Sequence, residues 1–141
     1  MRVVVDTNVI VSGLISSRGA PARIVDAILD QQVIPVFSKE TFSELLAVLQ
    51  RRKFNRYFAA AGLSIQSFLA NLSAVAEFVE VRPVRAAIRD PKDRPMLEVA
   101  GSAPPPDFIV TGDKDFVEHQ YGGVLVLSPA AFCRVALPPN K

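Results

Sequence analysis

Carboxylates follow two apolar runs of this chain at the point where each run ends. Asp6 comes directly after Val3–Val5, and Asp113 comes two residues after Phe108–Thr111. Both runs are short and largely apolar, which is typical of strands buried on both faces of a parallel sheet. Because ligands of such sheets gather at the carboxyl ends of the strands, we expect Asp6 and Asp113 to lie at one edge.

Two other segments supply further acidic side chains. Asp90 and Asp93 flank a turn that leads into a short helix, and Asp115 lies close to Asp113. Glu44 stands in a helix but off its main apolar face, from which it could reach the edge of a cleft. Each of these acids, taken alone, is typical of a turn or a helix cap. Together they form a set that folding could gather into one place.

The composition restricts what could bind such a set. The 141 residues include one histidine and one cysteine, which excludes a multi-histidine metal site, a cysteine-rich zinc site and an internal disulfide. Gathered carboxylates repel one another unless a cation compensates. Oxygen ligands favour a hard ion such as Mg²⁺ or Mn²⁺, which often pairs with substrate phosphates. Two interpretations remain open at this point: metal-dependent phosphate-ester chemistry, or ordinary turns and caps.

The apolar pattern predicts the elements that would position these acids. Strands are expected at 3–5, 33–37, 108–111 and 124–127, with a further one starting near 78–81, and helices from about 20, after Ser38, over 64–79, after Asp93 and after Ser128. This alternation predicts a three-layer α/β/α sandwich with a central, mainly parallel sheet of four to five strands. We expect a single domain over residues 1–137 and a frayed tail over 138–141.

The overall composition excludes several classes of protein. Apolar residues make up 50% and charged residues 21%, so the chain is not intrinsically disordered. No apolar run reaches about 18 residues, and the first run stops at Asp6, so neither a transmembrane helix nor a signal peptide is expected. A cytoplasmic protein is the simplest interpretation. The formal charge of +2 does not by itself indicate nucleic-acid binding, so that prediction must rest on local clusters.

The densest basic cluster has aromatic residues between its cations. It consists of Arg51, Arg52, Lys53 and Arg56. Such a cluster could follow an RNA backbone and stack bases. It could equally be a solvated helix end, where cations are favourable. Both interpretations stay open.

Three remaining features receive structural interpretations. His119 is expected at the surface, because nothing near it in the sequence completes a catalytic pair. Cys133 is expected to be a small buried apolar residue. The apolar stripe over 65–79 is expected to form core or an oligomer contact, with room for a dimer interface or a partner's groove.

Several segments, in this order and spacing, resemble the PIN (PilT N-terminal) domain family. They are VVDTNVIVS at 4–12, RDPKD at 89–93 with Met96-Leu97, and DFIVTGDKDF at 107–116, while SKETFSEL at 38–45 fits the helix that carries the family's glutamate. The resemblance covers nearly the whole chain. It is closest to the single-domain bacterial and archaeal PIN proteins that are regarded as toxins of toxin–antitoxin pairs.

The resemblance implies a metal-dependent endoribonuclease that leaves 5′-phosphate and 3′-hydroxyl ends. Its acidic residues would be Asp6, Glu44, Asp93 and Asp113, of which Asp6, Asp93 and Asp113 would hold Mg²⁺ or Mn²⁺. Supporting residues would be Asn8, Ser12, Asp90, Thr111 and Asp115. Among these, Asn8, Ser12 and Thr111 would orient Asp6 by hydrogen bonds. The number of metal ions stays open. A small antitoxin protein and a homodimer are the implied partners, besides RNA.

Arg94 departs from the family's pattern, and Asn8 bears on another class of enzyme. Arg94 stands where relatives often have a small or acidic residue, and it could contact substrate phosphate or compete with a metal. Asn8 occupies the place of the second aspartate that a phosphotransferase would need, which disfavours that class. The main alternative is a catalytically inert PIN fold that only binds RNA or a partner protein.

Overall fold

The computed structural model describes residues 1–60, 64–81, 94–113, 120–121 and 123–139. In these residues six strands form one sheet in the order β3-β2-β1-β4-β6-β5. The strands are β1 (Arg2–Val5), β2 (Ile34–Phe37), β3 (Glu77–Phe78), β4 (Phe108–Val110), β5 (Gln120–Tyr121) and β6 (Val124–Leu127). Five strands run parallel, and β5 pairs antiparallel with β6. The central position of β1 places its carboxyl end between those of β2 and β4.

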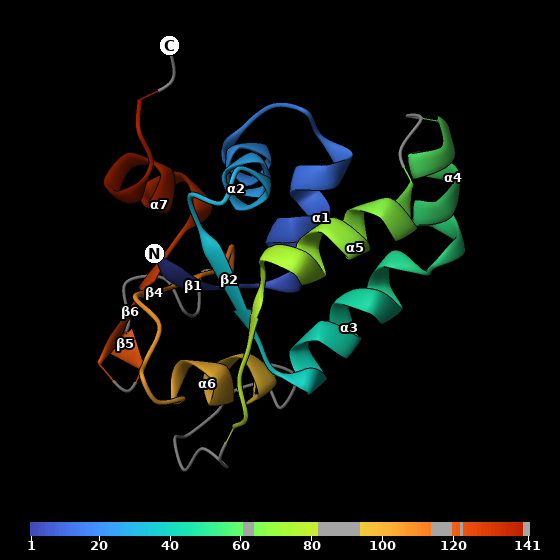
Figure 1. Cartoon of the computed structure of the whole chain (residues 1–141). Coiled ribbons are helices and arrows are strands. Elements are labelled where there is room, and N and C mark those ends of the chain that lie inside the picture. Colours follow the sequence, from blue (N-terminus) through green and yellow to red (C-terminus); the bar gives the residue numbers. More distant parts are fainter. Residues whose placement is uncertain (61–63, 82–93, 114–119, 122, 140–141) are drawn as a thin grey trace.

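Helices cover both faces of this sheet (Figure 1). They are α1 (Thr7–Ile15), α2 (Ala20–Leu29), α3 (Lys39–Leu49), α4 (Arg52–Ala60), α5 (Ile65–Val75), α6 (Arg94–Ala100) and α7 (Pro129–Ala136). Successive β1 side chains point to opposite faces, so Val3 and Val5 pack with α1, α2, α3 and α7, whereas Val4 packs with α6. The predicted three-layer α/β/α sandwich is therefore confirmed. The sixth strand, β5, is an addition that the sequence pattern does not predict.

The helix α1 is also absent from the sequence prediction. Its sequence, TNVIVSGLI, is apolar on most sides, and Val9, Ile10 and Val11 are all buried. The pattern therefore lacks the one-sided spacing that identifies an amphipathic helix. Only Asn8 and Ser12 of this helix are exposed, and two polar positions are too few to reveal a helical period in the sequence.

Two predicted boundaries are wrong. The helix predicted over 64–79 ends at Val75, and β3 begins at Glu77, before the predicted start near 78. The basic cluster does not lie in the last turn of a helix, where cations would be favourable. The helix α3 ends at Leu49, and Arg52 begins α4. Cations in the first turn of a helix are unfavourable for its dipole, so local helix stability does not explain them.

No helix in the described ranges is long and apolar enough to cross a membrane.

The helices α1 and α2 approach each other closely at Gly13. A Cβ atom at this position would lie 2.5 Å from the Pro21 carbonyl oxygen and 2.6 Å from Val25 Cγ2. Only a residue without a side chain allows α2 to pack at this distance. Gly13 therefore fixes the first turn of α2 beside α1.

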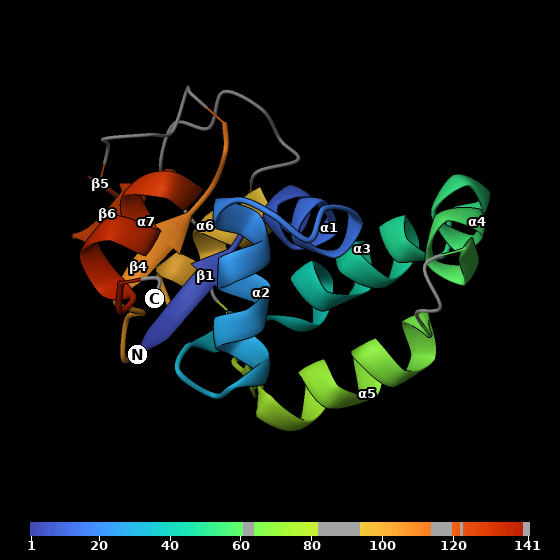
Figure 2. The ribbon, with the colours of Figure 1, turned by 90° about the horizontal axis from the view of Figure 1, so that it is seen from above.

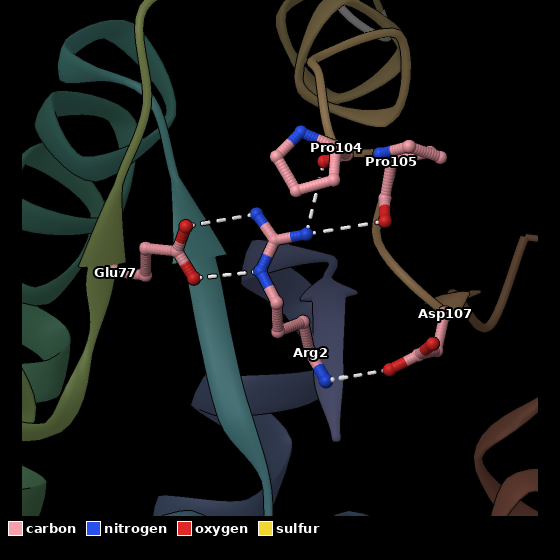
Figure 3. Close-up of polar contacts among 5 residues, drawn as sticks. All are labelled: Arg2, Glu77, Pro104, Pro105 and Asp107. Atoms are coloured by element: carbon pink, nitrogen blue, oxygen red, sulfur yellow. Dashed lines mark hydrogen bonds and ion pairs between the residues drawn. The ribbon is translucent and has the colours of Figure 1, made fainter.

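An arginine network ties the amino ends of the strands together (Figure 3). The Arg2 guanidinium donates from Nε to Glu77 Oε2 at 2.6 Å and from Nη2 to Glu77 Oε1 at 2.9 Å. Its Nη1 donates to the carbonyl oxygens of Pro104 and Pro105, and its backbone N–H donates to Asp107 Oδ2. The network thus joins β1 to the edge strand β3 and to the segment before β4.

Replacing Glu77 by glutamine is expected to weaken this network in a pH-dependent way. The hydrogen bond from Arg2 holds the pKa of Glu77 below its ordinary value, so its stabilising contribution is complete above about pH 5 and is lost as the pH falls through the lowered pKa. Glu77→Gln should lower the free energy of unfolding by about 0.5–1 kcal/mol at pH 7, because the pair is partly exposed. Urea denaturation at several pH values should show this difference shrinking below about pH 4. The matched control is the exposed Glu80→Gln; an equal effect there would contradict the assignment.

Candidate active site

Asp6 occupies the junction between β1 and α1. Its backbone N–H still donates to the Val110 carbonyl of β4 at 2.9 Å, and its side chain caps α1 by accepting from the Asn8 N–H at 3.4 Å. The strand therefore fixes the backbone of Asp6, and the helix N-terminus, which favours negative charge, orients its carboxylate.

A single hydroxyl connects Asp6 to the end of β4. Thr111 is fully buried, and its Oγ1 donates to Asp6 Oδ2 at 2.8 Å while accepting from the Asp113 N–H at 3.1 Å. The Thr111 N–H itself donates to the Leu127 carbonyl of β6 at 3.1 Å. Residues 105 positions apart in sequence are thus held together, and the carboxylate of Asp6 has one defined orientation.

The start of α3 positions the third acid. Ser38 caps this helix reciprocally with Thr41: Ser38 Oγ accepts from the Thr41 N–H at 3.1 Å, and Thr41 Oγ1 accepts from the Ser38 N–H at 2.9 Å. Such a capping box fixes the direction in which a helix leaves a strand. Glu44 follows Thr41 by three residues, and both side chains line the same pocket.

This pocket has a volume of about 540 Å³ and lies at the carboxyl ends of β1, β2 and β4. We call it the acidic pocket; among its lining residues are Asp6, Glu44 and Asp113, together with Asn8, Ser12, Met96, Pro21 and Pro129. The structure therefore brings together three of the four predicted acids. Asp93, the fourth, lies outside the described residues, as do Asp90, Asp115 and His119. Within the described ranges, no three acidic, histidine or cysteine side chains are close enough to one another to hold a metal ion.

The supporting residues contribute in different ways. Thr111 donates a hydrogen bond to Asp6 as predicted, whereas Asn8 reaches Asp6 through its backbone N–H rather than through its side chain. Ser12 lines the acidic pocket, but in the described part of the chain no hydrogen bond joins it to Asp6. Sequence reasoning did not identify Pro21 and Pro129 as pocket residues, because prolines in first helical turns carry no chemical signal.

The basic cluster around the start of α4 lies apart from this pocket. Both views place α4 at the ends of α3 and α5 that are farther from the sheet (Figures 1 and 2). Arg51 and Arg56 are exposed, whereas the side chains of Arg52 and Lys53 lie outside the described structure. Arg94 is exposed and begins α6, directly after the undescribed Asp93.

Cys133 has the structural role expected from the sequence. Its side chain is 4% exposed, and its Sγ donates to the Ala20 carbonyl at 3.5 Å. Burial raises the pKa of the Cys133 thiol, which keeps it protonated. Cys133 therefore belongs to the contact between α2 and α7 and not to the acidic pocket.

A family model described as a PIN domain matches residues 2–115. The chain belongs to the PIN domain family. PIN domains are typically nucleases, a class of hydrolases, and they generally use divalent metals. An uncharacterized protein of Methanocaldococcus jannaschii is 28% identical over 117 residues, which cover 83% of this chain and 74% of the relative. No solved structure matches the chain.

Proposed function

We propose that this PIN domain is a metal-dependent endoribonuclease that hydrolyses phosphodiester bonds in the acidic pocket. The observation that carries the proposal is the Thr111 hydroxyl, which donates to the Asp6 carboxylate and accepts from the Asp113 backbone N–H, in a pocket that Glu44 also lines. The buried hydroxyl fixes the Asp6 carboxylate in one orientation, as a metal ligand requires, and holds the backbone of Asp113 next to it.

The chemical type of the donors, rather than the spacing of the described acids, favours a hard divalent cation. Asp6, Asp113 and Glu44 offer carboxylate oxygens, and the described lining includes no histidine or cysteine that would favour a softer ion. We assign Asp6 and Asp113, together with Asp93, to hold Mg²⁺ or Mn²⁺. When bound, the cation supplies Lewis-acid stabilisation of the negative charge that builds on the phosphate.

The remaining roles fall to the chain's own side chains. We assign Glu44, which lines the pocket, to orient the attacking water and to accept its proton. Attack of that water forms a new P–O bond opposite the bond from phosphorus to the 3′ oxygen. That bond breaks, and the 3′ oxygen takes up a proton. The products carry 5′-phosphate and 3′-hydroxyl ends. Asp90 and Asp115 are assigned as nearby supporting acids, and Arg94 as a contact to substrate phosphate.

We further propose the setting in which this activity operates. The resemblance to single-domain PIN toxins supports a cytoplasmic toxin that forms a homodimer and is inhibited by a small antitoxin protein. An apolar groove of about 900 Å³ between α1, α2, α4 and α5, lined by Leu29, Tyr57, Ile65 and Phe68, offers a surface for such contacts. Light scattering of the purified protein tests the dimer, and growth arrest on expression tests the toxin.

The decisive experiment incubates the purified protein with a panel of end-labelled single-stranded RNAs. We expect cleavage with Mn²⁺ or Mg²⁺, no cleavage with excess EDTA, and recovery when the metal is restored. Mapping the ends should give 5′-phosphates. RNA that binds but stays intact under every metal condition would instead support the inert binding module and overturn the nuclease proposal.

Removing the Thr111 hydroxyl is expected to reduce activity without removing an acid. Thr111→Val keeps the side-chain shape but deprives Asp6 Oδ2 and the Asp113 N–H of their common partner. Loss of such an orienting group typically costs about 10–100-fold in metal affinity or activity. Isothermal titration with Mn²⁺ and cleavage rates should both show the loss. Thr111→Ser, which keeps the hydroxyl, should recover most of both; failure of this variant to recover them would indicate a packing defect.

A further inference from the structure

A second hollow of about 650 Å³ lies between α2, α7 and the loop before α2. Its lining includes Arg18, Arg23, Asp26, Ala130, Cys133 and Arg134, and we call it the arginine groove. Figure 2 shows α2 and α7 side by side. The groove is thus built by two helices that meet only in the folded protein.

The groove carries an excess of positive charge. Three arginines line it against one carboxylate, that of Asp26. Arg18 and Arg134 are exposed, and in the described part of the chain neither forms an ion pair or a side-chain hydrogen bond. Arg23 is half-buried and uses one Nη2 donor on the Pro138 carbonyl at 2.8 Å. Most of the guanidinium donors are therefore available to an anion.

The groove adjoins the acidic pocket at the first turns of α2 and α7. Pro21 and Pro129 line the acidic pocket, while their neighbours Ala22 and Ala130 line the arginine groove. The same first turns of α2 and α7 therefore separate an acidic hollow from a basic one. At this border the N-cap residue of α2 is Gly19, which provides no side-chain cap, so the first-turn N–H groups of α2 add positive potential.

We propose that the arginine groove binds backbone phosphates of the RNA strand next to the bond held in the acidic pocket. This inference rests on the proposed nuclease function. A pocket of carboxylates repels a polyanion, so binding of a strand needs cations placed outside the pocket but within reach of neighbouring phosphates. Arginine suits this role because its planar donors match phosphate oxygens. Such contacts hold the backbone and carry no sequence preference.

The test measures binding of a fluorescent single-stranded RNA by anisotropy in EDTA over a range of salt concentrations. The double variant Arg18→Ala/Arg134→Ala should bind about tenfold more weakly. The slope of log K against log salt should fall by about 1.4, because each lost phosphate contact on a single strand removes about 0.7. Arg18→Lys/Arg134→Lys keeps both charges and should retain the slope. Val135→Ala, an exposed neighbour on α7, should bind like the wild type.

Each other outcome overturns the proposal in a recognisable way. If Arg51→Ala/Arg56→Ala lowers the slope while Arg18→Ala/Arg134→Ala leaves it unchanged, the strand follows α4 instead. If the groove variant keeps its RNA slope but loses binding to polyglutamate, the groove serves an acidic protein. If the wild-type protein cleaves RNA in Mn²⁺ but the groove variant has an unchanged salt slope, the groove proposal is refuted and the nuclease proposal is not. Wild-type protein that neither binds nor cleaves RNA refutes the nuclease and the groove together.

Discussion

We expect the Asp6→Asn variant to cleave RNA at a rate lower by about 10³-fold or more. This loss exceeds the roughly 10–100-fold loss of activity that follows removal of a merely orienting group. Asparagine has nearly the same shape and caps helices as well as aspartate does, so it can still accept from the Asn8 N–H. The Thr111 hydroxyl can rotate to suit either amide atom. What the substitution removes is the negative charge that a divalent cation requires. Single-turnover cleavage with Mn²⁺ measures the loss directly.

A stability measurement separates this effect from unfolding. The free energy of unfolding of Asp6→Asn should stay within about 1 kcal/mol of the wild type, since the cap is preserved. Asp30→Asn, an exposed acid at the end of α2, is the matched control and should cleave RNA at the wild-type rate. Comparable cleavage by Asp6→Asn and wild type would remove Asp6 from the active site and, with it, the central assignment.

Substituting Gly13 by alanine should give the largest change in stability. The new Cβ would lie 2.5 Å from the Pro21 carbonyl oxygen, an atom of the backbone that can move only if α2 moves. Overpacking of this kind typically costs about 1–3 kcal/mol, and the better helix propensity of alanine returns about 0.5–1 kcal/mol. We expect a net loss of about 1–2 kcal/mol in the free energy of unfolding, measured by urea denaturation.

Gly101→Ala provides the control for this substitution. The nearest atom to a Cβ at Gly101 is the Glu98 carbonyl oxygen at 3.6 Å, which is ordinary van der Waals contact, so stability should change little. An equal loss at both glycines would show that loss of glycine itself, rather than the approach of α2, is responsible. Because Pro21 also lines the acidic pocket, Gly13→Ala should lower the cleavage rate as well.

The sequence predicts the parts of the site that follow from strand ends. Each of Asp6 and Asp113 follows an apolar run, which predicts that both lie at one edge of the sheet, and the structure brings both into one pocket. The helix start after Ser38 is also predicted, since serine before a helical pattern is a local signal, whereas its reciprocal hydrogen bonds with Thr41 are not. These features depend on a few neighbouring residues, which is why sequence alone reveals them.

The features that sequence does not predict depend on contacts between distant segments. The helix α1 is hidden because it is buried on most sides, and Gly13 has no distinguishing mark until α2 lies against it. Arg18 and Arg134 look like ordinary surface cations until α2 and α7 form one groove. A local sequence pattern does not predict such contacts between distant segments, because they depend on how whole helices and strands pack together.

The order of strands in the sheet has a consequence for synthesis of the protein. The central strand β1 is made first, but its neighbour β4 ends at Val110, and the hydroxyl and acid that complete the pocket follow at Thr111 and Asp113. A growing polypeptide on the ribosome therefore carries Asp6 through the synthesis of the next 105 residues without the hydroxyl that orients it. A fragment that ends before Thr111 lacks the hydrogen bond to Asp6 and the acid at position 113.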